Sequence, residues 1–288
     1  MIRLRQLFFV LCGMMAMVSC DSSTDDDVRI SASEYEAKDC FNYVNDNGTE
    51  SLQPGAYYGF VFDYVSATYS IVVKGLSDGN TLYPDFVAEG IKWSYSGPWK
   101  SSHATNVRAK TIDGSVMPAI MELNIHVLDR VTNGKLDPVY QIDMTFDNGV
   151  TFVTYPVQMN YYGTTTVSAQ GVKEFKTKES TYVLTIDRQT RKATVNVNNA
   201  RFAENMPVGM NMVFKDIDFT VTKKTIELES ASLIPEIGGD PYPAFAISQL
   251  AGSFGLSDGM SFDFHCAAMG SDYSVNVEAK VLPQLMEE

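Results

Sequence analysis

A chain of 288 residues with 45% hydrophobic and 20% charged residues has the apolar content to bury one large core or two of ordinary size, which excludes a disordered or collagen-like protein. The formal net charge is −13 and no basic cluster offsets it, so nucleic-acid binding is excluded. The same acidity argues against adhesion to anionic lipid through surface charge.

Residues 1–20 have the pattern of a secretion signal. A basic start is followed by an apolar run from Leu7 to Val18, which is too short to cross a membrane comfortably. The sequence Met17-Val-Ser-Cys20 resembles the lipobox of bacterial lipoproteins, with methionine where leucine is usual. The resemblance implies cleavage before Cys20, lipidation of its side chain, and anchoring to the outer membrane in the cell envelope.

Residues 21–38 are predicted to form an acidic flexible tether. They begin Asp-Ser-Ser-Thr-Asp-Asp-Asp, a polar stretch with nothing to bury. An acidic run directly after the lipidated cysteine resembles the signal that exports lipoproteins of Bacteroidetes to the outer face of the outer membrane. A solvated linker explains the run equally well, so surface exposure and a periplasmic location both stay open.

The rest of the chain alternates apolar and polar residues with a period of two, which predicts half-buried strands rich in β-branched and aromatic side chains. The predicted strands span residues 69–73, 122–127, 140–146, 182–186, 193–197, 214–221 and 273–279. Asx-Gly pairs, which favour hairpin turns, fall between them at 78–79, 113–114, 133–134, 148–149 and 258–259. Helical spacing is nearly absent, so we predict an all-β fold of antiparallel barrels or sandwiches.

One order of landmarks occurs twice: Tyr-Tyr-Gly, a tyrosine-led strand, a methionine-to-histidine strand, and a second tyrosine-led strand. The methionine-to-histidine strands are Met121-Glu-Leu-Asn-Ile-His126 and Met260-Ser-Phe-Asp-Phe-His265. This order predicts two tandem antiparallel barrel-like domains, residues 39–156 and 157–288, that arose by duplication. The alternative is chance similarity between alternating strands. The boundary is placed near Pro156 because proline does not continue a central strand.

The second half carries four strand motifs: Tyr161-Tyr-Gly-Thr164, Arg191-Lys-Ala-Thr-Val-Asn-Val197, Asn199-Ala-Arg-Phe-Ala-Glu-Asn-Met-Pro207 and Phe262-Asp-Phe-His-Cys266. By these motifs it resembles the calycin-like (lipocalin-like) β-barrel lipoprotein domains of Bacteroidetes, over a little under half of the chain. The resemblance implies an up-and-down antiparallel barrel. It brings no catalytic residue and no cofactor.

The two histidine strands also raise the question of chemistry. Alternate side chains of a strand share a face, so Glu122, Asn124 and His126 should oppose the apolar Met121, Leu123, Ile125 and Val127. In the second copy Asp263 and His265 should share the polar face. A carboxylate beside a histidine suits metal coordination or general base chemistry, whereas the alternative is a solvated outer face. One histidine and one carboxylate per domain are fewer than a zinc site needs, so we expect no metal.

The segment Trp93-Ser-Tyr-Ser-Gly-Pro-Trp99 contains both tryptophans of the chain. Flat aromatic faces on an exposed loop could stack on sugars or on another apolar ligand. Trp93, Tyr95 and Trp99 are therefore the predicted ligand or partner contacts. Ordinary packing beneath a turn is the alternative.

The two remaining cysteines, Cys40 and Cys266, leave two arrangements open. In an oxidising compartment they could form a disulfide that ties the start of the folded region to its last hairpin. The alternative is two unpaired thiols that pack as small apolar side chains.

The sequence contains no G-x-S-x-G elbow, H-E-x-x-H motif, P-loop or dinucleotide-binding fingerprint. We therefore expect a non-enzymatic envelope lipoprotein that binds a small apolar molecule, a glycan or a protein. The alternatives are an envelope hydrolase of glycans or lipids that uses dispersed carboxylates, and a structural component of a surface assembly. A deep pocket with two convergent acids would favour the hydrolase, and filled barrels with shallow grooves would favour binding.

Overall fold

The computed structural model describes residues 30–35, 40–46, 49–54, 56–96, 99–128, 131–132, 135–136, 139–169, 171–204, 206, 208–255 and 259–279. The predicted signal, the lipidation site at Cys20, residues 21–29 and 36–38 of the predicted tether, and the predicted turn at 133–134 lie outside these residues. Residues 30–35 of the predicted tether form a strand that pairs with Tyr57–Asp63, so this part of it belongs to a sheet.

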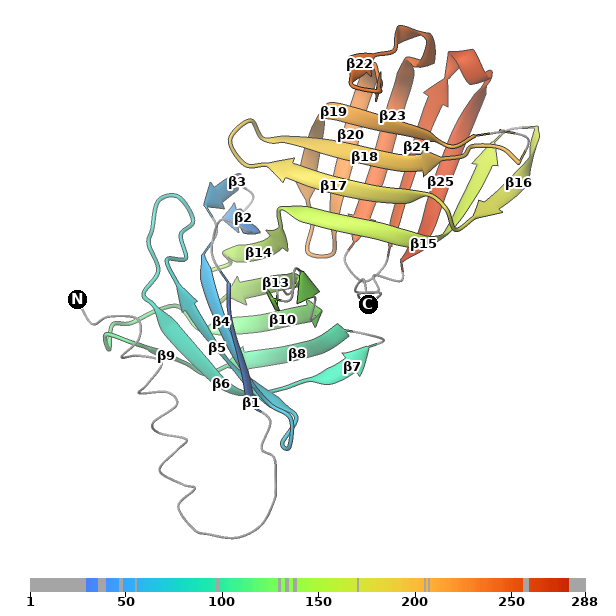
Figure 1. Ribbon diagram of the computed structural model, residues 1–288. Helices are drawn as coiled ribbons and strands as arrows, with labels where there is room; N and C mark the ends of the chain where they lie inside the picture. The colour runs from blue at the N-terminus through green and yellow to red at the C-terminus, as the bar shows by residue number, and fades with distance from the viewer. Residues whose placement is uncertain are drawn as a thin grey trace.

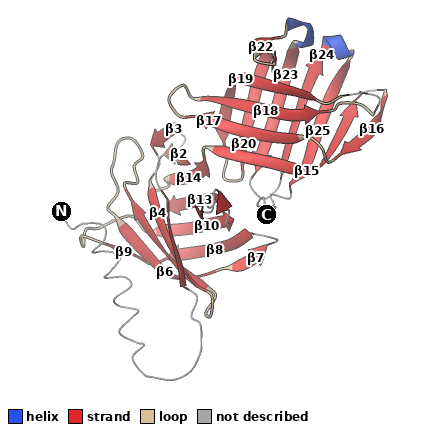
Figure 2. Cartoon of the chain, viewed as in Figure 1, coloured by secondary structure: helices blue, strands red, loops and turns tan. Residues whose placement is uncertain are grey.

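The described part of the chain is all-β, as the period-two alternation predicts. Its helical residues form only two short 3₁₀ turns, η2 (Pro243–Phe245) and η3 (Ala267–Met269), which Figure 2 shows at one end of the strands. None of the described helices has the length and apolar character required to cross a lipid bilayer.

The second half of the chain forms a closed antiparallel barrel of eight strands, coloured yellow to red in Figure 1. The strands are β15 (Gln158–Ala169), β17 (Thr181–Asp187), β18 (Lys192–Ala200), β19 (Met210–Val221), β20 (Thr225–Leu233), β23 (Ile247–Gly255), β24 (Met260–Cys266) and β25 (Ser271–Ala279). Each strand pairs with the barrel strand that follows it in the chain, and β25 returns to pair with β15. The up-and-down barrel that the resemblance implies is therefore present, and its closure leaves no free sheet edge in the ring.

Three short strands extend the barrel. Strand β16 (Val172–Thr177) pairs with the second half of β15, and the hairpin of β21 (Glu236–Ile237) and β22 (Asp240–Pro241) adds to β19.

The barrel interior is filled by the apolar side chains of the alternating pattern. Its buried side chains, each at most 3% exposed, include Met159, Tyr161, Tyr182, Leu184, Val195, Val197, Phe214, Leu228, Phe254, Phe262 and Val275. The ring of Phe262 packs edge-on against Tyr182 and Phe214, with centroids 5.7 and 6.4 Å away. These contacts are typical of a packed apolar core.

The first half of the chain folds as two antiparallel sheets. The five-stranded sheet contains β1 (Ile30–Tyr35), β4 (Tyr57–Asp63), β5 (Thr68–Lys74), β6 (Phe86–Lys92) and β9 (Ala109–Thr111). The seven-stranded sheet runs in the order β3 (Thr49–Pro54), β2 (Cys40–Asp46), β14 (Thr151–Pro156), β13 (Val139–Phe146), β10 (Ile120–Leu128), β8 (Trp99–Val107) and β7 (Ser94–Ser96). A separate hairpin joins β11 (Val131–Thr132) to β12 (Lys135–Leu136).

One apolar core lies between these two sheets, with Phe60 and Ile71 from the first and Ile125 and Ile142 from the second. Among the described residues no ladder joins the two sheets. The first half is therefore an open pair of sheets and differs from the barrel that the repeat led us to expect.

The structure confirms the seven predicted strands and corrects two details of the sequence interpretation. Met121 is 43% exposed, although the alternation placed it in the core. A bulge between Ile120 and Glu122 shifts the register, so that Ile120 takes the buried position. Asp113-Gly114 does not close a hairpin, because the flanking strands β9 and β10 belong to different sheets.

Candidate functional site

The outer face of the seven-stranded sheet carries a row of polar side chains that the strand register brings together. Asn124 on β10 lies opposite His103 on β8 and Asp143 on β13. Glu122 lies two residues before Asn124, on the same face. Side chains of directly paired residues on one face lie within contact distance, so the register alone assembles this group.

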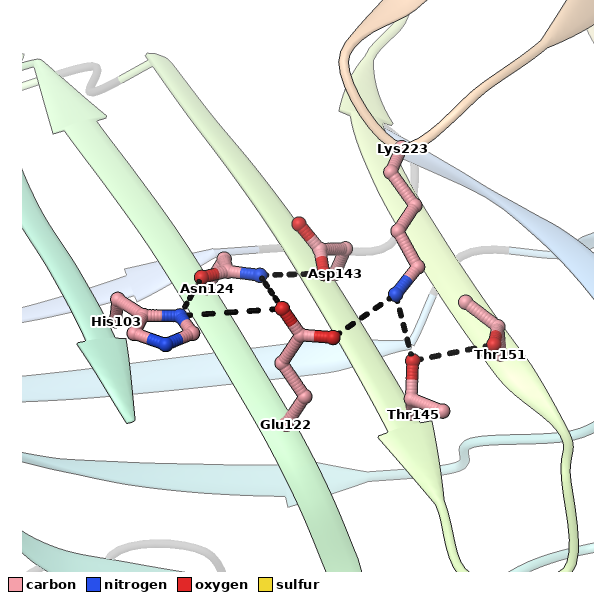
Figure 3. A network of polar contacts seen from close by, with 7 residues as sticks. All are labelled: His103, Glu122, Asn124, Asp143, Thr145, Thr151 and Lys223. Carbon is pink, nitrogen blue, oxygen red and sulfur yellow. Dashed lines mark hydrogen bonds and ion pairs between the residues drawn. The ribbon is translucent and has the colours of Figure 1, made fainter. Parts of the chain in front are cut away.

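Asn124 is the centre of the resulting network, which Figure 3 shows. Its Nδ2 donates hydrogen bonds to Asp143 Oδ1 at 2.9 Å and to Glu122 Oε1 at 3.1 Å. Its Oδ1 lies 2.6 Å from His103 Nδ1, which donates when that nitrogen carries the proton. One side-chain amide thus holds two carboxylates and an imidazole in place.

The two carboxylates have opposite pKa shifts. Burial raises the pKa of Asp143, which is 5% exposed, even though the hydrogen bond from Asn124 acts in the opposite direction. The hydrogen bonds from Asn124 and Lys223 lower the pKa of Glu122. Such a pair of acids is the pattern expected of general acid and base chemistry, and it also occurs in structural ion-pair networks.

A turn of the barrel lies on this network. Lys223, between β19 and β20, donates from Nζ to Glu122 Oε2 at 3.0 Å and to Thr145 Oγ1 at 3.1 Å. Gln141 Nε2 donates to the backbone oxygen of Lys223 at 2.6 Å and to the hydroxyl of Tyr155 at 2.9 Å. Glu122 therefore binds a lysine of the same chain, and this contact, together with the hydrogen bond from Gln141, connects the barrel to the seven-stranded sheet.

Apolar contacts extend this connection. The hydrophobic cluster of the barrel also includes Trp99, Leu128, Val153 and Tyr155 from the seven-stranded sheet. These residues are at most 5% exposed. The contact between the two halves thus has a polar part, centred on Asn124, and a buried apolar part.

The three aromatic residues predicted to contact a ligand are distributed over both faces of the sheet. Trp93 is 9% exposed, packs edge-on against Phe62, and donates from Nε1 to the backbone oxygen of Thr68 at 3.2 Å. Trp99 belongs to the cluster on the other face. Tyr95 is 63% exposed and lies edge-on to Trp93. A ligand contact stays a prediction for all three residues, and Tyr95 has the most accessible surface.

The polar faces of the two histidine strands have different partners. His126 Nδ1 lies 2.9 Å from the hydroxyl of Ser101. His265 Nδ1 lies 2.6 Å from Oδ1 of Asp272 on the next strand. Within the described residues no group of three or more histidine, cysteine, aspartate or glutamate side chains is arranged to hold a metal ion.

Sequence reasoning identified Glu122 and Asn124 as one polar face, but it missed His103, Asp143 and Lys223. The alternation of Gln141, Asp143 and Thr145 within β13 was a signal that these side chains share a face. Nothing in the local sequence indicates the contact with Lys223, which is 101 residues from Glu122.

Cys266 is a buried, unpaired thiol in the barrel core. This observation favours free thiols over a disulfide for Cys266, because its side chain packs as a small apolar group. The side chain of Cys40 lies outside the described residues.

Comparison with known proteins adds no family. No family model and no curated protein matches the chain. A solved structure of intact Ap-TbpB, with its N and C lobes, matches 83% of this chain and 76% of that chain at 10% sequence identity, with a TM-score of 0.23. A TM-score this low carries no argument, so the fold and site define the class: an all-β protein in which an eight-stranded up-and-down barrel contacts an open pair of sheets.

Proposed function

We propose that this protein is a lipid-anchored lipoprotein of the cell envelope that works as a non-enzymatic binding module. The observation that carries the proposal is the state of the two converging acids. Both acids accept a hydrogen bond from Asn124, and Glu122 also accepts one from Lys223 of the barrel, which links the two halves of the chain. Their engagement by side chains of their own chain supports a structural role.

The proposal places the ligand on an outer surface. The barrel interior is filled by apolar side chains, which argues against a small apolar molecule inside it and leaves a glycan or a protein as the partner. The lipobox-like sequence at Cys20 supports the proposed anchor in the outer membrane.

The proposal also includes two domains, residues 39–156 and 157–288, of calycin-like origin and related by duplication. Its support is the strand pairing. The histidine strands β10 and β24 each pair with the tyrosine-led strand that follows, β13 and β25.

The hydrolase is the second candidate function, because the opposite pKa shifts of Glu122 and Asp143 are those of an acid and base pair. Incubation of the purified full-length protein with nitrophenyl glycosides and nitrophenyl esters separates the two candidates. The binding proposal expects release of nitrophenol at the buffer rate. Turnover that is lost in both E122Q and D143N would refute the binding proposal and support the hydrolase. The control is D218N, on strand β19 of the barrel, which should keep that turnover.

The anchor is tested by fractionation of a Gram-negative host that expresses the full-length chain. We expect wild type in the membrane fraction after a high-salt wash, because acyl chains and not charge hold it there. The C20A variant should leave that fraction. An equal amount of both proteins in the membrane would refute lipidation at Cys20.

A further inference from the structure

A hollow lies on the outer wall of the barrel, across four neighbouring strands. Its volume is about 420 Å³, and residues of β15, β23, β24 and β25 line it. This volume is within the roughly 300–1,000 Å³ that is typical of small-ligand sites.

The strand register explains why the wall is hollow at this place. Ser168 on β15 pairs with Ser274 on β25, which pairs with Asp263 on β24. Asp263 pairs in turn with Ala251 on β23. Three of these four neighbours have small side chains, so the row forms a depression between larger side chains.

The side chains around the hollow offer both donors and acceptors of hydrogen bonds. Along β24, Asp263 and His265 share the outward face, and Asp272 holds His265 through its Nδ1 at 2.6 Å. This contact leaves the Nε2 atom of His265 available to a ligand. Gln249 adds an amide and is held outward at a bulge, with φ of +55°.

Asp263 is an exposed acceptor. Within the described part of the chain, no side chain pairs with its carboxylate, in contrast to Glu122 and Asp143 in the network of Asn124. A ligand in the hollow can therefore bind this carboxylate without displacing a side chain of the protein.

We propose that the hollow is a glycan-binding site for a neutral oligosaccharide, which rests on the binding function proposed above and names its ligand class. Vicinal sugar hydroxyls both donate and accept, which matches a rim of carboxylate, imidazole, amide and serine hydroxyl groups. Neither lysine nor arginine lines the hollow, so no cation is present to attract a phosphate, sulfate or uronate. The open position on the outer wall admits one or two sugar units of a longer chain.

The test is isothermal titration calorimetry of the full-length protein in detergent with five hexasaccharides: cellohexaose, xylohexaose, mannohexaose, maltohexaose and chitohexaose. We expect at least one of them to bind. D263A and H265A should each weaken that binding about tenfold, the effect of losing roughly one hydrogen bond to the ligand. Both side chains point outward from β24, so the melting temperatures of the variants should match that of wild type.

The matched control is D218A. Asp218 is an exposed carboxylate on β19, on the opposite side of the ring, where it pairs with Lys192. Its removal should leave the affinity unchanged.

Three results would overturn the inference. Wild type that binds none of the five sugars at millimolar concentration refutes the ligand class. Sugar binding that is equal in wild type, D263A and H265A refutes the hollow as the site, while the proposed binding function stands. Binding of spermidine, lost in D263A, together with no sugar binding would identify the hollow as a cation site.

Discussion

The sharpest test of the network between the halves is the substitution Asn124→Ala. Asn124 donates to both Asp143 and Glu122, and alanine removes both bonds. Asp143 is 5% exposed, so water cannot replace the lost donor easily. The variant therefore leaves a buried carboxylate with one partner fewer.

The expected cost follows from the charge of the acceptor. A hydrogen bond to a charged group contributes roughly 1.5–3 kcal/mol, and a neutral one contributes about 1 kcal/mol. We expect N124A to lower the free energy of unfolding by about 2–3 kcal/mol at neutral pH. In a D143N background the acceptor at position 143 is neutral, whereas the bond to Glu122 is unchanged, so the same substitution should cost about 1 kcal/mol less.

The loss of stability that N124A causes should also depend on pH. Burial raises the folded-state pKa of Asp143 above the ordinary value of 3.8, so the folded protein takes up a proton before the unfolded chain does. This group therefore adds stability as the pH falls through its folded pKa toward 3.8. Because the protonated carboxyl carries no charge, the penalty of N124A should become smaller over that interval.

Urea unfolding followed by tryptophan fluorescence measures the effect where it occurs. Both tryptophans of the chain, Trp93 and Trp99, lie in or beside the seven-stranded sheet that contains Asn124. N198A is the control, because Asn198 makes an exposed hydrogen bond on the barrel. Equal costs of N124A in the wild-type and D143N backgrounds would refute the role of the buried charge.

Three further predictions concern the barrel. Phe262→Ala should destabilise the barrel by about 3–5 kcal/mol in calorimetric unfolding, the usual range for a buried phenylalanine. The control V208A, at an exposed position, should have little effect. Equal effects of the two substitutions would contradict the packed interior. Burial raises the pKa of Tyr182 to about 12, so the folded state loses stability as the pH rises from 10 toward 12. Ultraviolet absorbance of the folded protein measures tyrosine ionisation. Ionisation of all 15 tyrosines near pH 10 would contradict this prediction. Cys266 should react with a thiol reagent only in denaturant, since it is 1% exposed, and rapid labelling of the native protein would show that the barrel core is open.

Local alternation predicted the strands because the side-chain period of a strand is a property of the backbone itself. Strand β24 shows it plainly, with Met260, Phe262, Phe264 and Cys266 buried and the residues between them outside. The same rule failed at Met121, because a bulge adds one residue to the pairing and no local signal marks it.

The network of Asn124 could not be predicted, because it depends on the register between strands and on a contact with a distant turn. The aromatic segment was predicted as a single surface, yet its residues point to both faces. Ser96 pairs with Trp99 and Tyr95 with Lys100, and directly paired residues share a face. This pairing puts Trp99 on the face opposite to Tyr95.

The closure of the barrel by β15 and β25 has a consequence for folding. Every other pair in the ring joins strands that follow one another in the chain, whereas these two are separated by roughly 100 residues. The contact order of the barrel is therefore dominated by its last strand. Until β25 has been synthesised, β15 and β24 both present open edges that can pair with other chains. Chaperone protection should matter most for this interval, and truncation before residue 271 should yield aggregates.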